Sequence, residues 1–240
     1  MLSEIDIHDI LFLDIETIPQ QRSFSELSEK MQSLWDKKSS YFRSEDETAD
    51  EAYNRAGIYA EFGRIICISV GVIFQGKSET GLRIKSYSGE NEKKLLTDFS
   101  VMIRNYAANR TLFLCAHNGK EFDFPYISRR MLINGIRLPA ILDNAGKKPW
   151  EIYHLDTMEL WKFGDFKHYT SLELLTAIFD IPSPKNDMDG SMVAGVYWED
   201  NDLERIVEYC QHDVRAIVQL FLRYKGLNLI KPENIEIVQD

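Results

Sequence analysis

Short apolar runs separated by polar segments predict an alternating α/β architecture. Five runs rich in Val, Ile, Leu and Phe have the length of buried strands. They occupy residues 9–14, 65–74, 80–88, 111–116 and 150–156. Three strands come first and helix then alternates with strand, so we expect an α/β fold with a mixed five-stranded sheet flanked by helices.

Apolar residues at a helical period mark the segments that would cover this sheet. Helices are expected from about residue 91 to 107, at 125–133, and from a cap at Thr170 or Ser171 toward Phe179. The clearest helix is 202–224, whose apolar residues form one continuous stripe. The stripe consists of Leu203, Ile206, Val207, Cys210, Val214, Ile217, Val218 and Phe221.

Residues 21–61 interrupt this alternation between the first two strands. The segment is polar and charged, and its apolar residues Phe24, Leu27, Met31 and Leu34 recur at helical spacing. A chain of 240 residues fits one domain. We therefore expect a single domain with a helical insertion.

Charge and composition narrow the function classes. The formal net charge of −10 argues against a protein that coats DNA through a broad basic surface. No apolar run approaches the roughly 18 residues of a membrane span, and the N-terminal MLSEIDIHDI is acidic, so we expect a cytoplasmic protein without a membrane partner. The three cysteines lie far apart in apolar surroundings, which favours buried reduced thiols over disulfides or zinc.

Two acids stand together in the segment LDIETIP. Asp14 and Glu16 are separated by one residue, so on a strand their side chains point to the same face. Acids commonly end strands, so the pair alone is weak evidence for chemistry.

A second polar group follows the fourth predicted strand, in AHNGKEFDFPYISRR. It places Asn118, Phe122 and Asp123 at the junction with a helix that Pro125 can begin. Open α/β sheets build ligand sites at such positions. The alternative is that Asp123 only caps the helix.

The third candidate pair lies on the helix at 202–224. Tyr209 and Asp213 are four residues apart and fall together on one margin of the apolar stripe, where they could meet the strand acids. An amphipathic border residue and a surface charge would give the same pattern. Glu208 and His212 fall on the solvent-facing side with Gln211, so we assign them no catalytic role.

These three segments, in this order, resemble the 3′–5′ exonucleases of the DEDD group, particularly the family related to the proofreading domains of family B DNA polymerases. DIETIP resembles the first motif, NGKEFDFP the second and YCQHDV the third. The Tyr-x-x-x-Asp spacing resembles the tyrosine branch, because the position that holds His in the other branch is Glu208. The likeness runs from about residue 10 to 224, through KNDMDGSMV, and is weak in the insertion and the C-terminal tail.

The resemblance implies a ribonuclease-H-like exonuclease fold and a two-metal mechanism. The family's four acids fall on Asp14, Glu16, Asp123 and Asp213, which would hold two Mg²⁺ or Mn²⁺ ions. Asp14 would bridge the ions, Glu16 and Asp213 would bind the ion that holds the attacking water, and Asp123 would serve the other. Tyr209 would orient the water, and the products would be nucleoside 5′-monophosphates.

Substrate contacts are expected from two places beside these acids. They are the backbone and side chains near Thr17 and Ile18, and the side chains of Asn118 and Phe122. Phe122 could stack on a base or belong to the core. Basic side chains that could contribute, or be only solvated surface, are Arg129, Lys147, Lys148 and Lys185. Asp156 follows the fifth strand as a supporting acid, for which cap or turn duty is favoured.

The expected partner is single-stranded nucleic acid, with DNA preferred over RNA on the polymerase resemblance alone. An RNA-trimming exonuclease and a noncatalytic nucleic-acid-binding domain of the same fold are the alternatives. Because the insertion at 21–61 directly follows the first motif, we expect it to cover the active site or shape the entry of the strand.

Overall fold

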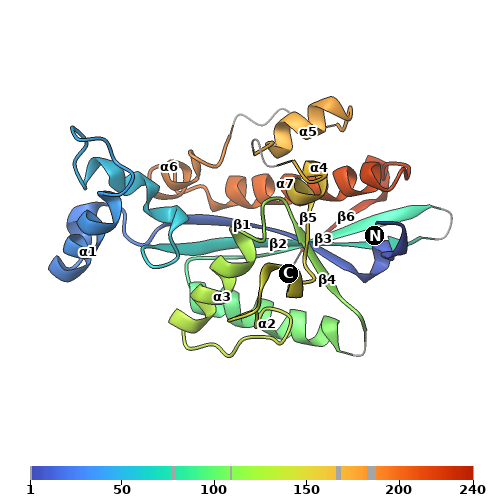
Figure 1. The fold of residues 1–240 in the computed structure, drawn as a ribbon, viewed down its shortest axis with the longest axis horizontal. Coiled ribbons are helices and arrows are strands. Elements are labelled where there is room, and N and C mark those ends of the chain that lie inside the picture. Colours follow the sequence, from blue (N-terminus) through green and yellow to red (C-terminus); the bar gives the residue numbers. More distant parts are fainter. Residues whose placement is uncertain (1, 77–78, 109, 166–168, 183–187, 240) are drawn as a thin grey trace.

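Six strands form one mixed sheet in the computed structural model, which describes residues 2–76, 79–108, 110–165, 169–182 and 188–239 (Figure 1). The order across the sheet is β5-β4-β1-β2-β3-β6, and β1–β2 and β2–β3 pair antiparallel while the other neighbours are parallel. The strands are β1 (Ile10–Pro19), β2 (Gly63–Gln75), β3 (Thr80–Ser88), β4 (Phe113–Ala116), β5 (Leu155–Asp156) and β6 (Ile235–Val238).

Helices cover both faces of this sheet. One face carries α2 (Glu92–Ala107) and α3 (Asp123–Ile133), and the opposite face carries α4 (Thr157–Lys162), α5 (Leu172–Ile178), α6 (Val193–Trp198) and α7 (Leu203–Tyr224) (Figure 1). The predicted helices at 91–107, 125–133 and 202–224 are all present. Ser171, rather than Thr170, caps α5, since its side chain accepts the backbone N–H of Leu174.

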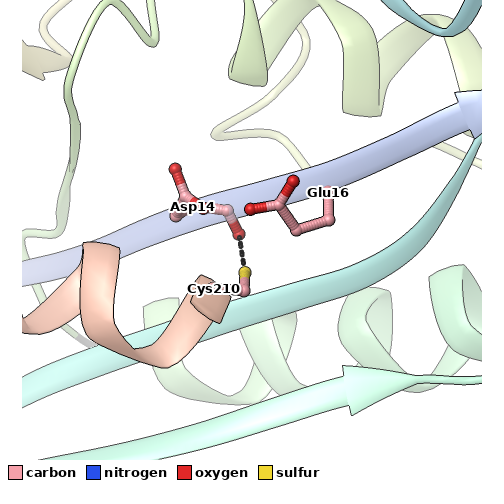
Figure 2. Close-up of side chains that lie close together, drawn as sticks. All are labelled: Asp14, Glu16 and Cys210. Atoms are coloured by element: carbon pink, nitrogen blue, oxygen red, sulfur yellow. Dashed lines mark hydrogen bonds between the residues drawn. The ribbon is translucent and has the colours of Figure 1, made fainter. Parts of the chain in front are cut away.

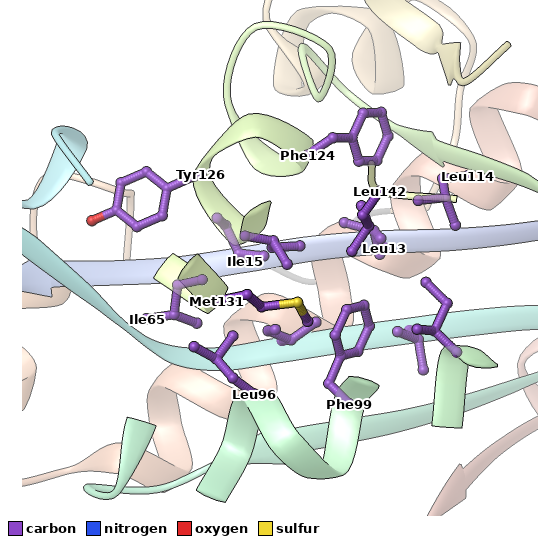
Figure 3. Close-up of a cluster of buried hydrophobic side chains, with 14 of the residues drawn as sticks. Leu13, Ile15, Ile65, Leu96, Phe99, Leu114, Phe124, Tyr126, Met131 and Leu142 are labelled. Atoms are coloured by element: carbon purple, nitrogen blue, oxygen red, sulfur yellow. The ribbon is translucent and has the colours of Figure 1, made fainter. Parts of the chain in front are cut away.

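The alternation of side chains along β1 divides the core into two layers. Leu11, Leu13 and Ile15 are buried against α2 and α3, in the cluster that includes Phe99 and Met131 (Figure 3). Residues of opposite parity, beginning with Ile10 and Phe12, pack instead against the apolar stripe of α7. These two positions start the row that continues into the acids of the first motif.

The observed strands differ from the predicted ones at three places. β1 continues to Pro19, because its pairing with β2 persists past the apolar run, so Asp14 and Glu16 lie inside the strand rather than at its end. β5 is limited to Leu155–Asp156. The sheet has a sixth strand in the C-terminal tail, β6, so the predicted count of five was wrong; short and half-exposed, β6 lacks the apolar run expected of a buried strand.

The segment at 21–61 contains helices and has a small aromatic core. It contains α1 (Glu29–Ser39) and 3₁₀ turns at Phe24–Glu26 and Glu51–Ile58. Trp35 is fully buried, contacts Tyr53 edge to face, and donates its indole N–H to Ala49 O at 2.8 Å. Leu34, which the periodicity placed inside, is exposed. The insertion extends from the end of the sheet where β1 finishes (Figure 1).

The sequence predicts no membrane-spanning segment. None of the helices in the described residues is long and apolar enough to cross a bilayer.

Candidate active site

The acids of the first motif continue the α7-facing row of β1. Ile10 and Phe12 pack under α7. The next two residues of the same strand face are Asp14 and Glu16. The two carboxylates lie side by side on the strand next to Cys210 of α7 (Figure 2). Glu16 is only 6% exposed. Strand spacing therefore places two carboxylates in a largely buried position beneath a helix.

The helix above them supplies the third acid. Helical spacing brings Tyr209 and Asp213 together, and the Tyr209 hydroxyl donates to the Asp213 carboxylate. Both residues are half-buried and line the same cleft as Asp14 and Glu16. The geometry predicted for this margin of α7 is confirmed.

Asp123 enters from the second motif and reaches the first. It is the first residue of α3, whose N-cap position is Phe122, so the capping alternative for Asp123 is not realised. β4 ends at Ala116, and the backbone N–H of Ile15 on the neighbouring strand donates to the Asp123 carboxylate. This hydrogen bond holds Asp123 between the positions of Asp14 and Glu16.

Burial raises the pKa of every carboxyl group in this set, and repulsion from neighbouring acids adds to the effect for Asp14, Glu16 and Asp123. For Asp14 and Glu16, loss of solvent is the largest cause and the charge of Asp213 the next. Burial raises the pKa of Asp123 to about 8 and that of Asp213 to about 6. Such a set favours a bound cation, because the alternative is to protonate the acids.

The residues present fit oxygen-binding divalent ions. The Oδ2 atom of Asp14 is buried without a hydrogen-bond partner. Carboxylate oxygens are the ligands that Mg²⁺ and Mn²⁺ prefer. An unpaired buried acceptor of this kind suits a bound cation.

Cys210 lies close enough to be considered a further ligand. Ligand atoms of Asp14, Glu16 and Cys210 all fall within 4.8 Å of one another. The Cys210 thiol, however, donates to the backbone oxygen of Asp14 at 3.4 Å (Figure 2), and burial raises its pKa. A protonated thiol that bonds the strand is a structural contact between α7 and β1, and all three cysteines are buried and free.

The second-motif loop is fixed from β5. The Asp156 carboxylate accepts the backbone N–H groups of Asn118 at 3.0 Å and Lys120 at 3.1 Å. It also caps α4 by accepting from Met158 and Glu159. The favoured cap role for Asp156 is thus present together with a supporting role in the loop.

His117 holds the other side of the same loop, a contact that the sequence did not indicate. Its ring nitrogens lie 2.9 Å from Thr157 Oγ1 and 2.9 Å from Thr170 O. Burial lowers the pKa of His117, which favours a neutral ring. The motif gave no signal for it, because its partners lie 40 and 53 residues away.

A cleft of about 1120 Å³ opens over the acids. Its floor holds Asp14, Glu16, Asp123 and Asp213, and its walls come from the insertion, the second-motif loop and the segment around α6. The insertion thus lines the cleft at its start, through residues 22–26, and at its end, through residues 50–58.

Three of the four expected substrate residues line the cleft, and the fourth does not. Thr17, Asn118 and Phe122 line the cleft, and Phe122 also packs on Tyr126 with ring centroids 5.3 Å apart. Ile18 is fully buried against α6 and does not line the cleft, so the structure does not place it in contact with substrate. Asn118 has a left-handed backbone, with φ of 62°, which Asn tolerates better than most residues.

The three expected basic residues that the structure describes do not line the cleft. Arg129 is exposed elsewhere on α3, Lys147 bonds Asn144, and Lys148 lies over the ring of Trp150. Lys185 lies outside the described residues. Cleft-lining residues that sequence reasoning missed include Arg22, Arg55 and Trp198.

Glu208 and His212 do not line the catalytic cleft, as their helical phase predicted. Glu208 borders a separate groove beside β3 and β6. Gln211 is not simply solvent-facing, since its side-chain amide donates to Ser86 Oγ at 2.9 Å.

A protein-family comparison identifies the class of protein. The chain belongs to a family described as predicted 3′–5′ exonucleases related to the exonuclease domain of PolB, whose family model matches residues 58–231. The match includes the second and third motifs and confirms the ribonuclease-H-like fold class. Exonuclease domains of this kind act on nucleic acid and use divalent metals. Asp14 and Glu16 precede the matched region, so their place beside the other acids comes from the structure.

Proposed function

We propose that this protein is a divalent-metal-dependent 3′–5′ exonuclease that releases nucleoside 5′-monophosphates from single-stranded DNA or frayed 3′ ends. The observation that carries the proposal is the convergence of four carboxylates, from β1, α3 and α7, in one cleft. No described basic side chain lowers the pKa of these carboxyl groups. Such a centre needs cations from outside the chain.

Asp14, Glu16, Asp123 and Asp213 are the proposed metal ligands and catalytic residues. Two Mg²⁺ or Mn²⁺ ions would supply water activation and stabilise charge on the phosphate and the leaving oxygen. Asp14 lies centrally among the acids and suits both ions, while Glu16 and Asp213 suit the ion on the water side and Asp123 the other.

Tyr209 is proposed to orient the attacking water. Burial and the charges of Asp213, Glu16 and Asp14 raise the pKa of its phenol, so the hydroxyl stays protonated at neutral pH. It therefore acts as a hydrogen-bond donor or relay and not as a base. Its bond to Asp213 fixes its position at the edge of the cleft.

The terminal nucleoside is proposed to lie beside the second-motif loop. Asn118 Oδ1 is a buried acceptor without a partner at the cleft wall, suited to a sugar hydroxyl or a base N–H. The Phe122 ring offers a face for stacking, and Thr17 lines the cleft beside the first motif.

Digestion of end-labelled DNA and RNA single strands with Mg²⁺ or Mn²⁺ tests chemistry, polarity and sugar preference together. We expect mononucleotides from the 3′ end and faster release from DNA. Faster release from RNA would identify an exoribonuclease, and binding of either strand without cleavage would identify a noncatalytic domain.

The variant Asp14→Ala is the companion test. It should abolish cleavage while the far-UV circular dichroism stays that of a folded protein. Full activity of this variant would remove the proposed metal centre.

A further inference from the structure

Buried polar atoms without partners are concentrated in the cleft. Among the described residues, six such side-chain atoms exist, and four of them belong to cleft-lining residues: Asp14 Oδ2, Arg55 Nε, Asn118 Oδ1 and Trp198 Nε1. An unsatisfied buried group costs about 1–3 kcal/mol. Their concentration in one place indicates groups that bind a ligand.

Arg55 projects to the cleft from the end of the insertion. One end of its guanidinium is held by Glu47, at 2.5 Å from Nη2, and the group lies 4.8 Å from the centroid of the Phe42 ring. Its side chain is still 38% exposed, and Nε has no partner. The guanidinium is thus fixed in place with donor capacity remaining.

Arg22 adds a second cation from the start of the insertion, three residues after β1 ends at Pro19. Its backbone N–H donates to the Glu26 carboxylate, but its exposed guanidinium forms no ion pair with the described residues. Glu51, the nearest acid in sequence to Arg55 on this wall, is engaged by the N–H and hydroxyl of Thr48. Arg22 therefore keeps its charge available at the cleft, whereas Arg55 is paired with Glu47 and retains one donor, Nε, without a partner.

The ligand implied by these groups is an anion rich in acceptors. Arginine and the indole N–H can only donate, and Trp198 lies on α6, another part of the cleft wall. Among the described residues that line the cleft, Arg22 and Arg55 are the only arginines or lysines, beside eight acids. Phosphodiester groups match this donor set in charge and geometry.

We propose that Arg22, Arg55 and Trp198 form a second phosphate subsite that holds the strand on the 5′ side of the scissile bond. The inference rests on the proposed function. In a 3′–5′ exonuclease the terminal nucleotide brings only the scissile phosphate to the acids, so any further phosphate in the cleft belongs to the strand that remains. The insertion then acts as a strand-holding element and makes binding depend on substrate length.

Fluorescence anisotropy with a labelled ten-nucleotide deoxythymidine strand tests the subsite directly. Asp14→Asn serves as the common background, which keeps the strand intact. Adding Arg55→Gln or Arg22→Gln should weaken binding roughly tenfold, as expected for a charged hydrogen bond. Each should also lower the slope of log affinity against log salt by about 0.7. Adding Trp198→Phe, which removes the N–H donor and keeps an aromatic ring without changing the charge, should weaken binding without a change in slope.

Two controls separate this role from a structural one. Glu47→Gln removes the partner that holds Arg55 but keeps its charge, so the salt slope should stay at the background value. Arg83→Gln, at an exposed arginine that pairs with Glu236 on the β6 side of the sheet, should change neither quantity. The subsite is overturned if Arg55→Gln retains the background slope, or if Glu47→Gln reproduces its effect.

A kinetic comparison distinguishes failure of the subsite from failure of the proposed function. The p-nitrophenyl ester of thymidine 5′-monophosphate has a single phosphate and needs only the acids. Arg55→Gln should raise KM on the ten-nucleotide strand several-fold more than on the ester. Equal changes on both substrates would overturn the subsite. If the wild-type protein hydrolyses neither, the exonuclease proposal fails, while the anisotropy result still decides whether a strand is bound here.

Discussion

The backbone N–H of Asn118 donates a 3.0 Å hydrogen bond to the carboxylate of Asp156, which lies on the neighbouring strand. The same buried carboxylate accepts three other backbone N–H groups, two of them from the first turn of α4. A side chain outside the three motifs thus determines where the second-motif loop lies relative to the acids.

Replacing Asp156 tests this dual role. Asp156→Ala leaves four N–H groups without their acceptor, so we expect a loss of unfolding free energy of about 2–4 kcal/mol and a lower kcat. Asp202→Ala is the matched control, because Asp202 caps α7 through the single N–H of Arg205. It should cost about 1 kcal/mol with kcat unchanged. Urea denaturation and exonuclease rates measure both; equal losses for the two variants would contradict the loop-positioning role.

Tyr209→Phe tests the hydroxyl that donates to Asp213. Losing one hydrogen bond to a charged group should reduce kcat roughly 10- to 100-fold. The melting temperature should change little, because the residue is half-buried and the ring remains. Glu208→Gln is the control. Glu208 directly precedes Tyr209 in the sequence but borders the separate groove beside β3, so this variant should keep the wild-type rate. A wild-type rate for Tyr209→Phe would remove the water-positioning role.

Asp123 should make the metal-free protein less stable as pH rises. Its folded pKa of about 8 lies above the unfolded value near 3.9, so its contribution is fully present below pH 4 and is lost as pH rises to 8. In EDTA, Asp123→Asn should therefore gain stability relative to wild type between pH 5 and 8, by up to about 1.4 kcal/mol per pH unit.

Thermal melts across this pH range measure the difference, and Mg²⁺ or Mn²⁺ should reduce it by binding the wild-type acids. Asp98→Asn, at an exposed carboxylate that pairs with Lys94, controls for the loss of one negative charge. A pH-independent difference between Asp123→Asn and wild type would contradict the effect of burial on this carboxyl group.

Cys210 should matter for packing and not for metal binding. Cys210→Ser keeps a donor for the backbone oxygen of Asp14, whereas Cys210→Ala leaves that contact empty. We expect Cys210→Ala to lower stability by about 1 kcal/mol, and both variants to keep their Mg²⁺ dependence. A large shift in the Mg²⁺ concentration for half-maximal activity in Cys210→Ser would instead identify the sulfur as a ligand.

The arrangement of side chains could be predicted from the sequence where it depends on a single strand or helix. The one-residue spacing of Asp14 and Glu16 and the four-residue spacing of Tyr209 and Asp213 are consequences of strand and helix geometry. The sequence is a poor guide to features that depend on the pairing of strands. The length of β1 and the existence of β6 depend on hydrogen bonds to β2 and β3, to which local apolar runs give little guide.

The pairing of Asp14 with Glu16 and that of Tyr209 with Asp213 were determined by the sequence itself, because period-two and period-3.6 patterns assign side chains to faces before any folding is considered. Only the tertiary structure decided what surrounds them. The hydrogen bond from Ile15 to Asp123, the support from Asp156 and His117, and the approach of Arg22 and Arg55 to the cleft all join segments distant in the chain. Such contacts arise from the packing of the sheet, its helices and the insertion, which no local pattern records.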